Sequence, residues 1–323
     1  MPLLPLLKPM FEAQLSSPPM PDDVPPAQMR AAMHAMIDKS FFALATPQAP
    51  VASERDITIA VRAGEITLRL YRGAPENALL PCHVYYHGGG FFLGTLDQSD
   101  NYCRALARAV GCAVVSVDYR LAPEHRFPTA AEDAYSALVW TASHAQELRI
   151  DPALISVGGG SAGGNLAAVV AQMARERLGP SIVAQVLEIP VTDFTSMLAL
   201  EFPDEGIRFE PAKAYAPLYL RDETDAHDPL ASPLLAKSLS GLPPALVVCA
   251  EYDQLQPEGE DYARRLSEAG VPTTYRLLHG QFHGSQGFDA VIPAEAAAYR
   301  EEIASFLTEA YRKQASVRAQ TAI

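Results

Sequence analysis

The sequence has few cysteines, no excess of basic residues and no long hydrophobic run. Its four cysteines, Cys82, Cys103, Cys112 and Cys249, include no C-x-x-C pair, so we predict neither a zinc site nor a disulfide framework. Acidic residues outnumber basic ones by 38 to 25, and the net charge of -13 would repel nucleic acid and anionic membrane surfaces. We therefore expect neither nucleic acid nor a membrane among its partners.

No apolar run approaches the length of a membrane-spanning helix. The first ten residues are apolar, but prolines interrupt them, and they lack a basic start and a convincing cleavage site. We therefore expect a cytoplasmic protein. Hydrophobic residues make up 49% of the 323 residues, which is enough to fill the core of one large α/β unit with an accessory segment.

Strand-like and helix-like segments alternate along most of the chain. Two early segments, joined by Ala63 and Gly64, show the alternation of a half-buried antiparallel pair, and later apolar runs are typical of buried strands. The predicted strands are residues 57–61, 66–71, 82–86, 112–117, 154–157, 184–189, 245–249 and 273–278. This order predicts an α/β fold with a mostly parallel eight-stranded sheet and helices on both faces.

Two segments outside this alternation are predicted to form a helical cap. One is rich in proline and precedes the first strand, and the other is an apolar stretch too long for a simple connection. A last helix over residues 293–312 leaves a tail without apolar periodicity, which we expect to be loose. The predicted parts are residues 1–50 (cap), 51–192 (core), 193–217 (cap), 218–313 (core) and 314–323 (tail).

A serine between glycines lies where a strand-like run passes into a helix-like one. The segment Gly159-Gly160-Ser161-Ala162-Gly163 has the G-x-S-x-G spacing of a nucleophile elbow, whose sharp turn exposes the hydroxyl. The same stretch spells G-x-G-x-x-G from Gly158 to Gly163, with Glu188 closing the next strand, as in dinucleotide-binding proteins. The local motif therefore leaves open a nucleophile, a dinucleotide site or a tight turn without chemistry.

A serine hydroxyl becomes a useful nucleophile only with a base to take its proton and an acid to orient that base. Asp253 follows a predicted strand at the edge of the sheet that presents Ser161. Glu251 and Asp193 are its rivals. Glu251 is expected where strand becomes loop, whereas Asp253 reaches the rim, so we favour Asp253.

Candidate bases lie in the loop predicted after the last strand, which carries His279 and His283. His283 is further from the strand end and has a glycine on its far side, so we rank it first. The chain order Ser161, Asp253, His283, each residue following a core strand, is the order of a serine triad on such a sheet.

A glycine-rich segment, His87-Gly88-Gly89-Gly90-Phe91, directly follows the predicted strand 82–86. Backbone N–H groups without side-chain obstruction can bind the oxyanion that develops in acyl transfer. We predict that Gly88 and Gly89, with the N–H of Ala162 after the nucleophile, form this oxyanion hole.

With these residues assembled, the chain resembles the bacterial hormone-sensitive-lipase family of esterases, also called family IV, within the α/β-hydrolase superfamily. The motifs that carry the resemblance are His87 to Phe91, Asp118 to His125, Ser161 to Leu166, Asp253 with Glu258 and Gly259, and Phe282 to Gly284. Three positions depart from the usual pattern, namely Gly160 before the serine, Gln254 after the acid and Ser285 after His-Gly.

The resemblance implies the α/β-hydrolase fold and a serine carboxylesterase that hydrolyses small-molecule esters of short to medium acyl chains through an acyl-enzyme. It implies no metal or organic cofactor, and family members often pair as homodimers. Amide, lactam and thioester hydrolysis use the same machinery and remain alternatives. So do a dinucleotide-binding oxidoreductase and a non-catalytic binding protein of the same fold.

Overall fold

The computed structural model describes residues 2–15, 24–44, 46, 50–199 and 210–321. Its centre is one eight-stranded sheet with the order β1-β2-β4-β3-β5-β6-β7-β8. The strands are β1 (Ser53–Val61), β2 (Gly64–Arg72), β3 (Leu80–Tyr86), β4 (Ala113–Asp118), β5 (Ile150–Gly160), β6 (Gln185–Glu188), β7 (Ala245–Tyr252) and β8 (Thr273–Phe282). Strand β2 runs antiparallel to both of its neighbours, and all other pairs in the sheet are parallel. The predicted fold, a mostly parallel sheet of eight strands, is confirmed.

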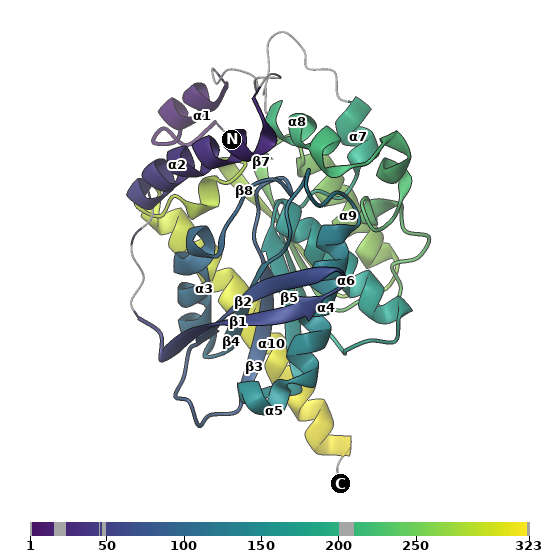
Figure 1. Ribbon diagram of the computed structural model, residues 1–323. Coiled ribbons are helices and arrows are strands. Elements are labelled where there is room, and N and C mark those ends of the chain that lie inside the picture. Colours follow the sequence, from purple (N-terminus) through teal and green to yellow (C-terminus); the bar gives the residue numbers. More distant parts are fainter. Residues whose placement is uncertain (1, 16–23, 45, 47–49, 200–209, 322–323) are drawn as a thin grey trace.

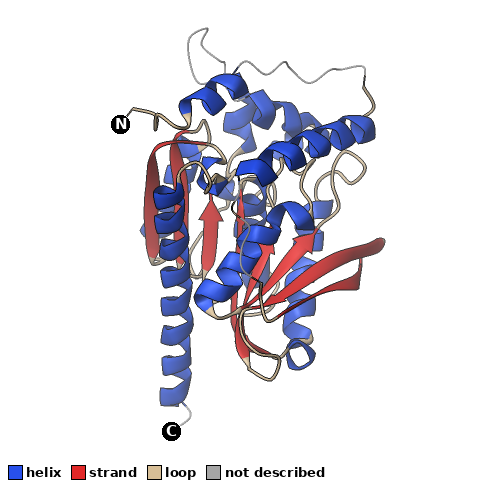
Figure 2. Ribbon diagram, turned by 90° about the vertical axis from the view of Figure 1, so that its left-hand side faces the viewer, coloured by secondary structure: helices blue, strands red, loops and turns tan. Residues whose placement is uncertain are grey.

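Helices cover both faces of this sheet (Figures 1 and 2). They are α1 (Lys8–Leu15), α2 (Pro26–Leu44), α3 (Leu96–Val110), α4 (Thr129–Ser143), α5 (Ala145–Leu148), α6 (Ala162–Glu176), α7 (Phe194–Ala199), α8 (Glu210–Tyr219), α9 (Gln256–Glu268) and α10 (Pro293–Thr321). Helices α1, α2, α7 and α8 gather at one end of the molecule, the upper end in Figure 1. They come from the two segments predicted to form the cap, and residues 200–209 of that prediction lie outside the described residues.

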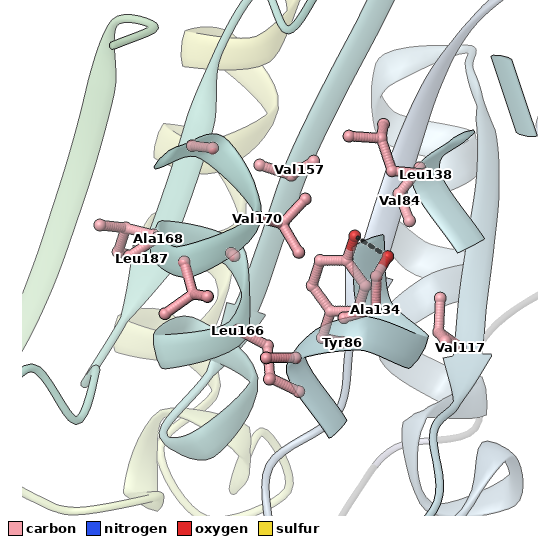
Figure 3. Packing of buried hydrophobic residues seen from close by; sticks show 14 of the residues in the cluster. Val84, Tyr86, Val117, Ala134, Leu138, Val157, Leu166, Ala168, Val170 and Leu187 are labelled. Carbon is pink, nitrogen blue, oxygen red and sulfur yellow. Dashed lines mark hydrogen bonds between the residues drawn. The ribbon is translucent and has the colours of Figure 1, made fainter. Parts of the chain in front are cut away.

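Alternation along the strands sends successive side chains into two separate cores. In β3, Val84 and Tyr86 are buried in the cluster that includes α4, α6 and α9, whereas Tyr85 is buried in the cluster that includes α3 and α10. In Figure 3 the Tyr86 hydroxyl reaches α4 and donates to the carbonyl of Ala134 at 3.1 Å. Each fully buried large apolar side chain stabilises the fold by roughly 1.5–3 kcal/mol, so the sheet is fixed from both sides.

The last helix is longer than the sequence predicted. Helix α10 continues to Thr321, so the prediction of a loose tail is wrong for residues 314–321, while 322–323 lie outside the described residues. Absent apolar periodicity indicates only that the helix faces solvent on all sides here. Residues with good helix propensity dominate this stretch, and Arg318 forms an ion pair with Asp151 at 2.7 Å.

Strand β8 also extends past its predicted end at residue 278, since it runs to Phe282. His279 therefore lies in the strand, not in the loop where the sequence analysis placed it, and His283 is the first residue beyond the strand.

Among the described residues, no helix combines the length and the apolar character needed to cross a bilayer.

Candidate active site

Ser161 stands at a sharp turn between the end of β5 and the start of α6. Its backbone angles, φ 56° and ψ -114°, lie in a region that L-residues rarely adopt, at a cost on the order of 1–3 kcal/mol. The surrounding backbone holds it there. The N–H of Ser161 donates to the carbonyl of Glu188 at 2.8 Å, and its carbonyl accepts from the N–H of Asn165 at 3.0 Å.

The glycines of the elbow allow α6 to approach β3 closely. A Cβ atom on Gly163 would lie 1.9 Å from the carbonyl oxygen of Tyr86, and one on Gly159 would lie 2.3 Å from the same oxygen. Larger residues at these two positions would push the helix off the sheet and displace Ser161. Gly160 is different, since the nearest atom to an added Cβ is the Tyr85 hydroxyl at 4.0 Å.

The structure brings together the three residues predicted to form the triad. The Oγ of Ser161 lies 3.0 Å from Nε2 of His283, and Nδ1 of His283 lies 2.7 Å from Oδ2 of Asp253. The Asp253 side chain is 1% exposed, and its other oxygen accepts from the N–H of Leu255 at 2.9 Å. The carboxylate is thus fixed by two donors, and the imidazole bridges it to the hydroxyl.

The rival acids are occupied elsewhere. The Oε2 of Glu251, within β7, accepts from the N–H of Gly280 at 2.7 Å and lies 3.4 Å from Nδ1 of His279. Asp193 caps the start of α7, where its carboxylate accepts from both the N–H and the hydroxyl of Thr195. The two ring nitrogens of His283 lie within hydrogen-bond distance of Asp253 and Ser161 instead.

The glycine segment after β3 lies beside the nucleophile. A Cβ atom on Gly88 would be 3.6 Å from Cβ of Ser161, while Gly89 and Gly90 have φ angles of 124° and 61°, which favour glycine. Ala162 is the first residue of α6, and N–H groups at a helix start have no partner within the helix. Of the three predicted oxyanion-hole residues, Gly88 therefore lies beside Ser161 in space and Ala162 follows it in the chain, while Gly89 is the residue after Gly88.

His87, at the start of this segment, is a neutral structural residue. Burial lowers the pKa of its imidazole to about 4. Its Nδ1 lies 2.9 Å from the carbonyl oxygen of Gly88, so a neutral ring with the proton on Nδ1 donates to that carbonyl. The ring stacks on Tyr119 at 4.2 Å between centroids, and the Tyr119 hydroxyl donates to the His87 carbonyl. These contacts fix the base of the glycine segment.

Two residues of helices α2 and α8 contact this segment or the residue after it, and sequence reasoning missed both. A Cβ on Gly90 would be 2.2 Å from a ring atom of Tyr215 in α8. Arg30 of α2 donates to the carbonyl of Phe92 at 2.8 Å and pairs with Glu124 at 2.5 Å. The sequence carried no signal for these contacts, because they join segments more than sixty residues apart.

Glu188 is not available to a dinucleotide ribose. The residue is 3% exposed, and its carboxyl accepts from the hydroxyl of Tyr102 at 2.7 Å and from that of Tyr299. Burial raises the pKa of this carboxyl to about 7. The glycines of the G-x-G-x-x-G pattern thus form the elbow, and Glu188, the acid that a dinucleotide site would need for the ribose, is buried against two tyrosines.

Within the described ranges, no group of three His, Cys, Asp or Glu side chains could hold a metal ion.

A serine elbow, a histidine after the last strand and a carboxylate after the strand before it define an α/β hydrolase. The model of the alpha/beta hydrolase fold family matches residues 83–287, and the chain belongs to this family. The match agrees with the predicted resemblance to the hormone-sensitive-lipase esterases.

The relatives of this chain include several esterases. It is 46% identical over 238 residues to the carboxylic ester hydrolase LipN of Mycobacterium tuberculosis, a match covering 71% of this chain and 63% of LipN. It is 40% identical over 260 residues to an arylesterase of Saccharolobus solfataricus, covering 76% of this chain and 81% of the relative. Among solved structures, a hyperthermophilic esterase from the archaeon Pyrobaculum calidifontis superposes with a TM-score of 0.86 at 39% identity, covering 96% and 99% of the two chains.

Proposed function

We propose that this serine carboxylesterase acts through Ser161 as nucleophile, His283 as general base and acid, and Asp253 as the group that orients the imidazole. The protein is a carboxylic ester hydrolase, as its family and its relatives support. The single observation that carries the residue assignment is the chain of contacts from Asp253 Oδ2 through His283 to Ser161 Oγ, at 2.7 and 3.0 Å.

The reaction follows from this geometry in two stages. Ser161 Oγ attacks the ester carbonyl carbon while its proton passes to Nε2 of His283. The resulting tetrahedral intermediate collapses, and the imidazolium returns the proton to the departing alkoxide, which leaves as the alcohol. Water then attacks the acyl-enzyme and gives its proton to His283. The second intermediate collapses, the imidazolium returns this proton to Ser161 Oγ, and the acid is released. Asp253 stabilises the imidazolium without taking its proton.

The negative charge that forms on the carbonyl oxygen is assigned to the N–H groups of Gly88, Gly89 and Ala162. Gly88 lies beside Ser161 and Ala162 follows it, which supports this assignment. Each such donor typically contributes about 3 kcal/mol to stabilisation of the transition state. Tyr119 and Tyr215 contact the segment that presents two of the donors, and Arg30 bonds to Phe92 directly after it.

Small-molecule esters with short to medium acyl chains are the proposed substrates. The relatives' names, carboxylic ester hydrolase and arylesterase, favour ester over amide, lactam or thioester substrates. A location in the cytoplasm and pairing of two copies stay predictions.

Replacing the nucleophile tests the proposal. Ser161→Ala should lower hydrolysis of a short p-nitrophenyl ester by at least about a thousandfold, with an unchanged circular dichroism spectrum. Ser143→Ala, which alters an exposed serine at the end of α4, should leave the rate unchanged. Undiminished hydrolysis by Ser161→Ala would refute the assignment.

A further inference from the structure

Strand β8 contains a bulge just before the candidate base. Its parallel pairing with β7 is regular up to Ala250 opposite Leu278 and resumes at Tyr252 opposite Phe282. One residue of β7, Glu251, therefore faces three residues of β8, 279–281. Such bulges are over-represented beside active sites, where they redirect the strand and its side chains.

The centre of this bulge is held from two sides. Gly280 has a φ of 68°, a conformation that favours glycine. Its N–H donates to Oε2 of Glu251 at 2.7 Å, and its carbonyl accepts from the N–H of Leu4 at 2.8 Å. Both polar groups of the bulged residue are thus satisfied by partners other than the neighbouring backbone of β7. Glu251 is the partner of the N–H, and Leu4 of the N-terminal segment is the partner of the carbonyl.

The N-terminal segment also covers the residues that precede the acid and the base. The ring of Phe11 in α1 lies 5.4 Å from that of Phe282 and 6.0 Å from that of Tyr252, measured between centroids. Phe282 is 3% exposed and Leu7 is fully buried in the same cluster. Phe282 directly precedes His283 in the chain and Tyr252 directly precedes Asp253, so these ring contacts adjoin the base and the acid.

We propose that Glu251 is a positioning residue for the catalytic histidine. By holding the N–H of Gly280 it fixes the bulge, and the bulge sets the place from which His283 reaches Ser161. This inference rests on the proposed function. In this proposal Glu251 acts through the backbone of Gly280, while the Nδ1 of His283 bonds to Asp253 at 2.7 Å. The reaction rate depends strongly on the positions of the reacting groups, because a displacement of about 1 Å can lower it about a hundredfold.

The experiment compares three changes at Glu251 with a matched control. Glu251→Ala removes the acceptor, Glu251→Asp keeps the charge but shortens the reach, and Glu251→Gln keeps an oxygen that can accept from Gly280. Glu302→Ala is the control, because Glu302 of α10 pairs with Arg276 of β8, the strand that contains the bulge, at 2.8 Å. The side chains of Glu302 and Glu251 are 25% and 24% exposed. The kcat and KM are measured with a short p-nitrophenyl ester, and a covalent phosphonate counts the competent sites.

We expect Glu251→Ala and Glu251→Asp to lower kcat per competent site by about 10- to 100-fold with KM within about twofold. Glu251→Gln should stay within about threefold of the wild type, and Glu302→Ala within about twofold. The proton between His283 and Asp253 gives a low-field NMR signal in such triads, and we expect it to shift or broaden in the alanine and aspartate variants alone.

Two outcomes would overturn the inference. One is an alanine variant with the kcat and the low-field signal of the wild type. The other is a glutamine variant as impaired as the alanine variant, which would assign the effect to charge and not to the bond. If the wild type fails to hydrolyse esters, the proposed function fails, whereas the NMR comparison still tests the positioning of His283.

Discussion

At the scale of single residues, two glycines of the elbow should differ in how much stability they lose when the same methyl group is added. We expect Gly163→Ala to destabilise the protein by about 1–3 kcal/mol or more, because its Cβ would lie 1.9 Å from the Tyr86 carbonyl oxygen. Gly160→Ala should change the free energy of unfolding by less than about 0.5 kcal/mol, since the nearest atom is 4.0 Å away. Urea denaturation of both variants checks this, and equal losses would contradict it.

Glu188 should make stability depend on pH. Burial raises the pKa of this carboxyl from its ordinary 4.5 to about 7 in the folded protein, so folding favours its neutral form. The contribution of Glu188 to the free energy of unfolding is fully present below pH 4.5 and is lost as the pH rises through about 7. This loss amounts to about 3 kcal/mol. The tyrosines around it, Tyr85, Tyr102 and Tyr299, stay neutral throughout because burial raises the pKa of each hydroxyl well above its ordinary value.

Glu188→Gln tests this directly. The free energy of unfolding is measured at pH 5 and pH 8 for the wild type and the variant. We expect the wild type to lose more stability between these values than the variant does, because glutamine does not ionise. Parallel losses in the two proteins would show that Glu188 does not titrate in this range.

The residues of the candidate triad could be predicted from the sequence, because each follows a strand whose carboxyl end must lie at one edge of a parallel sheet. The contacts of Glu251 with Gly280 and of Tyr215 with Gly90 could not be predicted. Glu251 was considered as a rival acid, but its bond to Gly280 depends on a bulge that leaves no periodic signal. Tyr215 contacts Gly90 from another segment, and nothing local to either residue records that contact.

At the scale of elements, Arg30 attaches α2 to the core. Its guanidinium bonds to the carbonyls of Phe92 and Ala122 and pairs with Glu124. Its charge also lies 4.8 Å from the centre of the Phe92 ring. We expect Arg30→Ala to loosen α2 while the sheet stays intact, because these bonds join the helix to the loop after the glycine segment.

Amide hydrogen exchange measures this loosening. Exchange over residues 26–38 should rise at least about tenfold in Arg30→Ala, while exchange in β5 and β6 should not change. Lys8→Ala is the control, because Lys8 and Glu12 form an exposed pair at 3.8 Å that contributes little to stability. Equal effects of the two variants on α2 would contradict the role of Arg30.

The elements themselves were predicted well where burial leaves a pattern. The inner strands were found because their apolar runs are buried, and β1 and β2 were found because apolar and polar residues alternate along them. Their ends were less certain, and β8 passes its predicted end by four residues, to Phe282. The tail of α10 was missed because a solvent-exposed helix has no apolar periodicity, and only propensity and the Arg318–Asp151 pair indicate it.

At the scale of the whole molecule, the sheet brings residues that are distant in the sequence together in one site. Ser161 and His283 are 122 residues apart in the chain, yet their side chains lie 3.0 Å apart. Two separate cores hold the sheet, one against α4, α6 and α9 and one against α3 and α10. Helices α2 and α8 then contact the glycine segment or the residue after it. The succession of the strands along the chain and the mostly parallel sheet could be inferred from the sequence. Their order across the sheet and the contacts of α2 and α8 beside the glycine segment required the structure.

The central claim is that Ser161 becomes acylated during ester hydrolysis. Mixing the enzyme with a short p-nitrophenyl ester, quenching in acid within milliseconds and mapping the peptides by mass spectrometry tests it most directly. The account predicts a burst of p-nitrophenolate approaching one equivalent if deacylation is the slower step. It also predicts an acyl group on Ser161, which should accumulate to a higher level when deacylation is slowed at low pH. An acyl group on any other residue, or turnover by Ser161→Ala at the wild-type rate, would contradict the account.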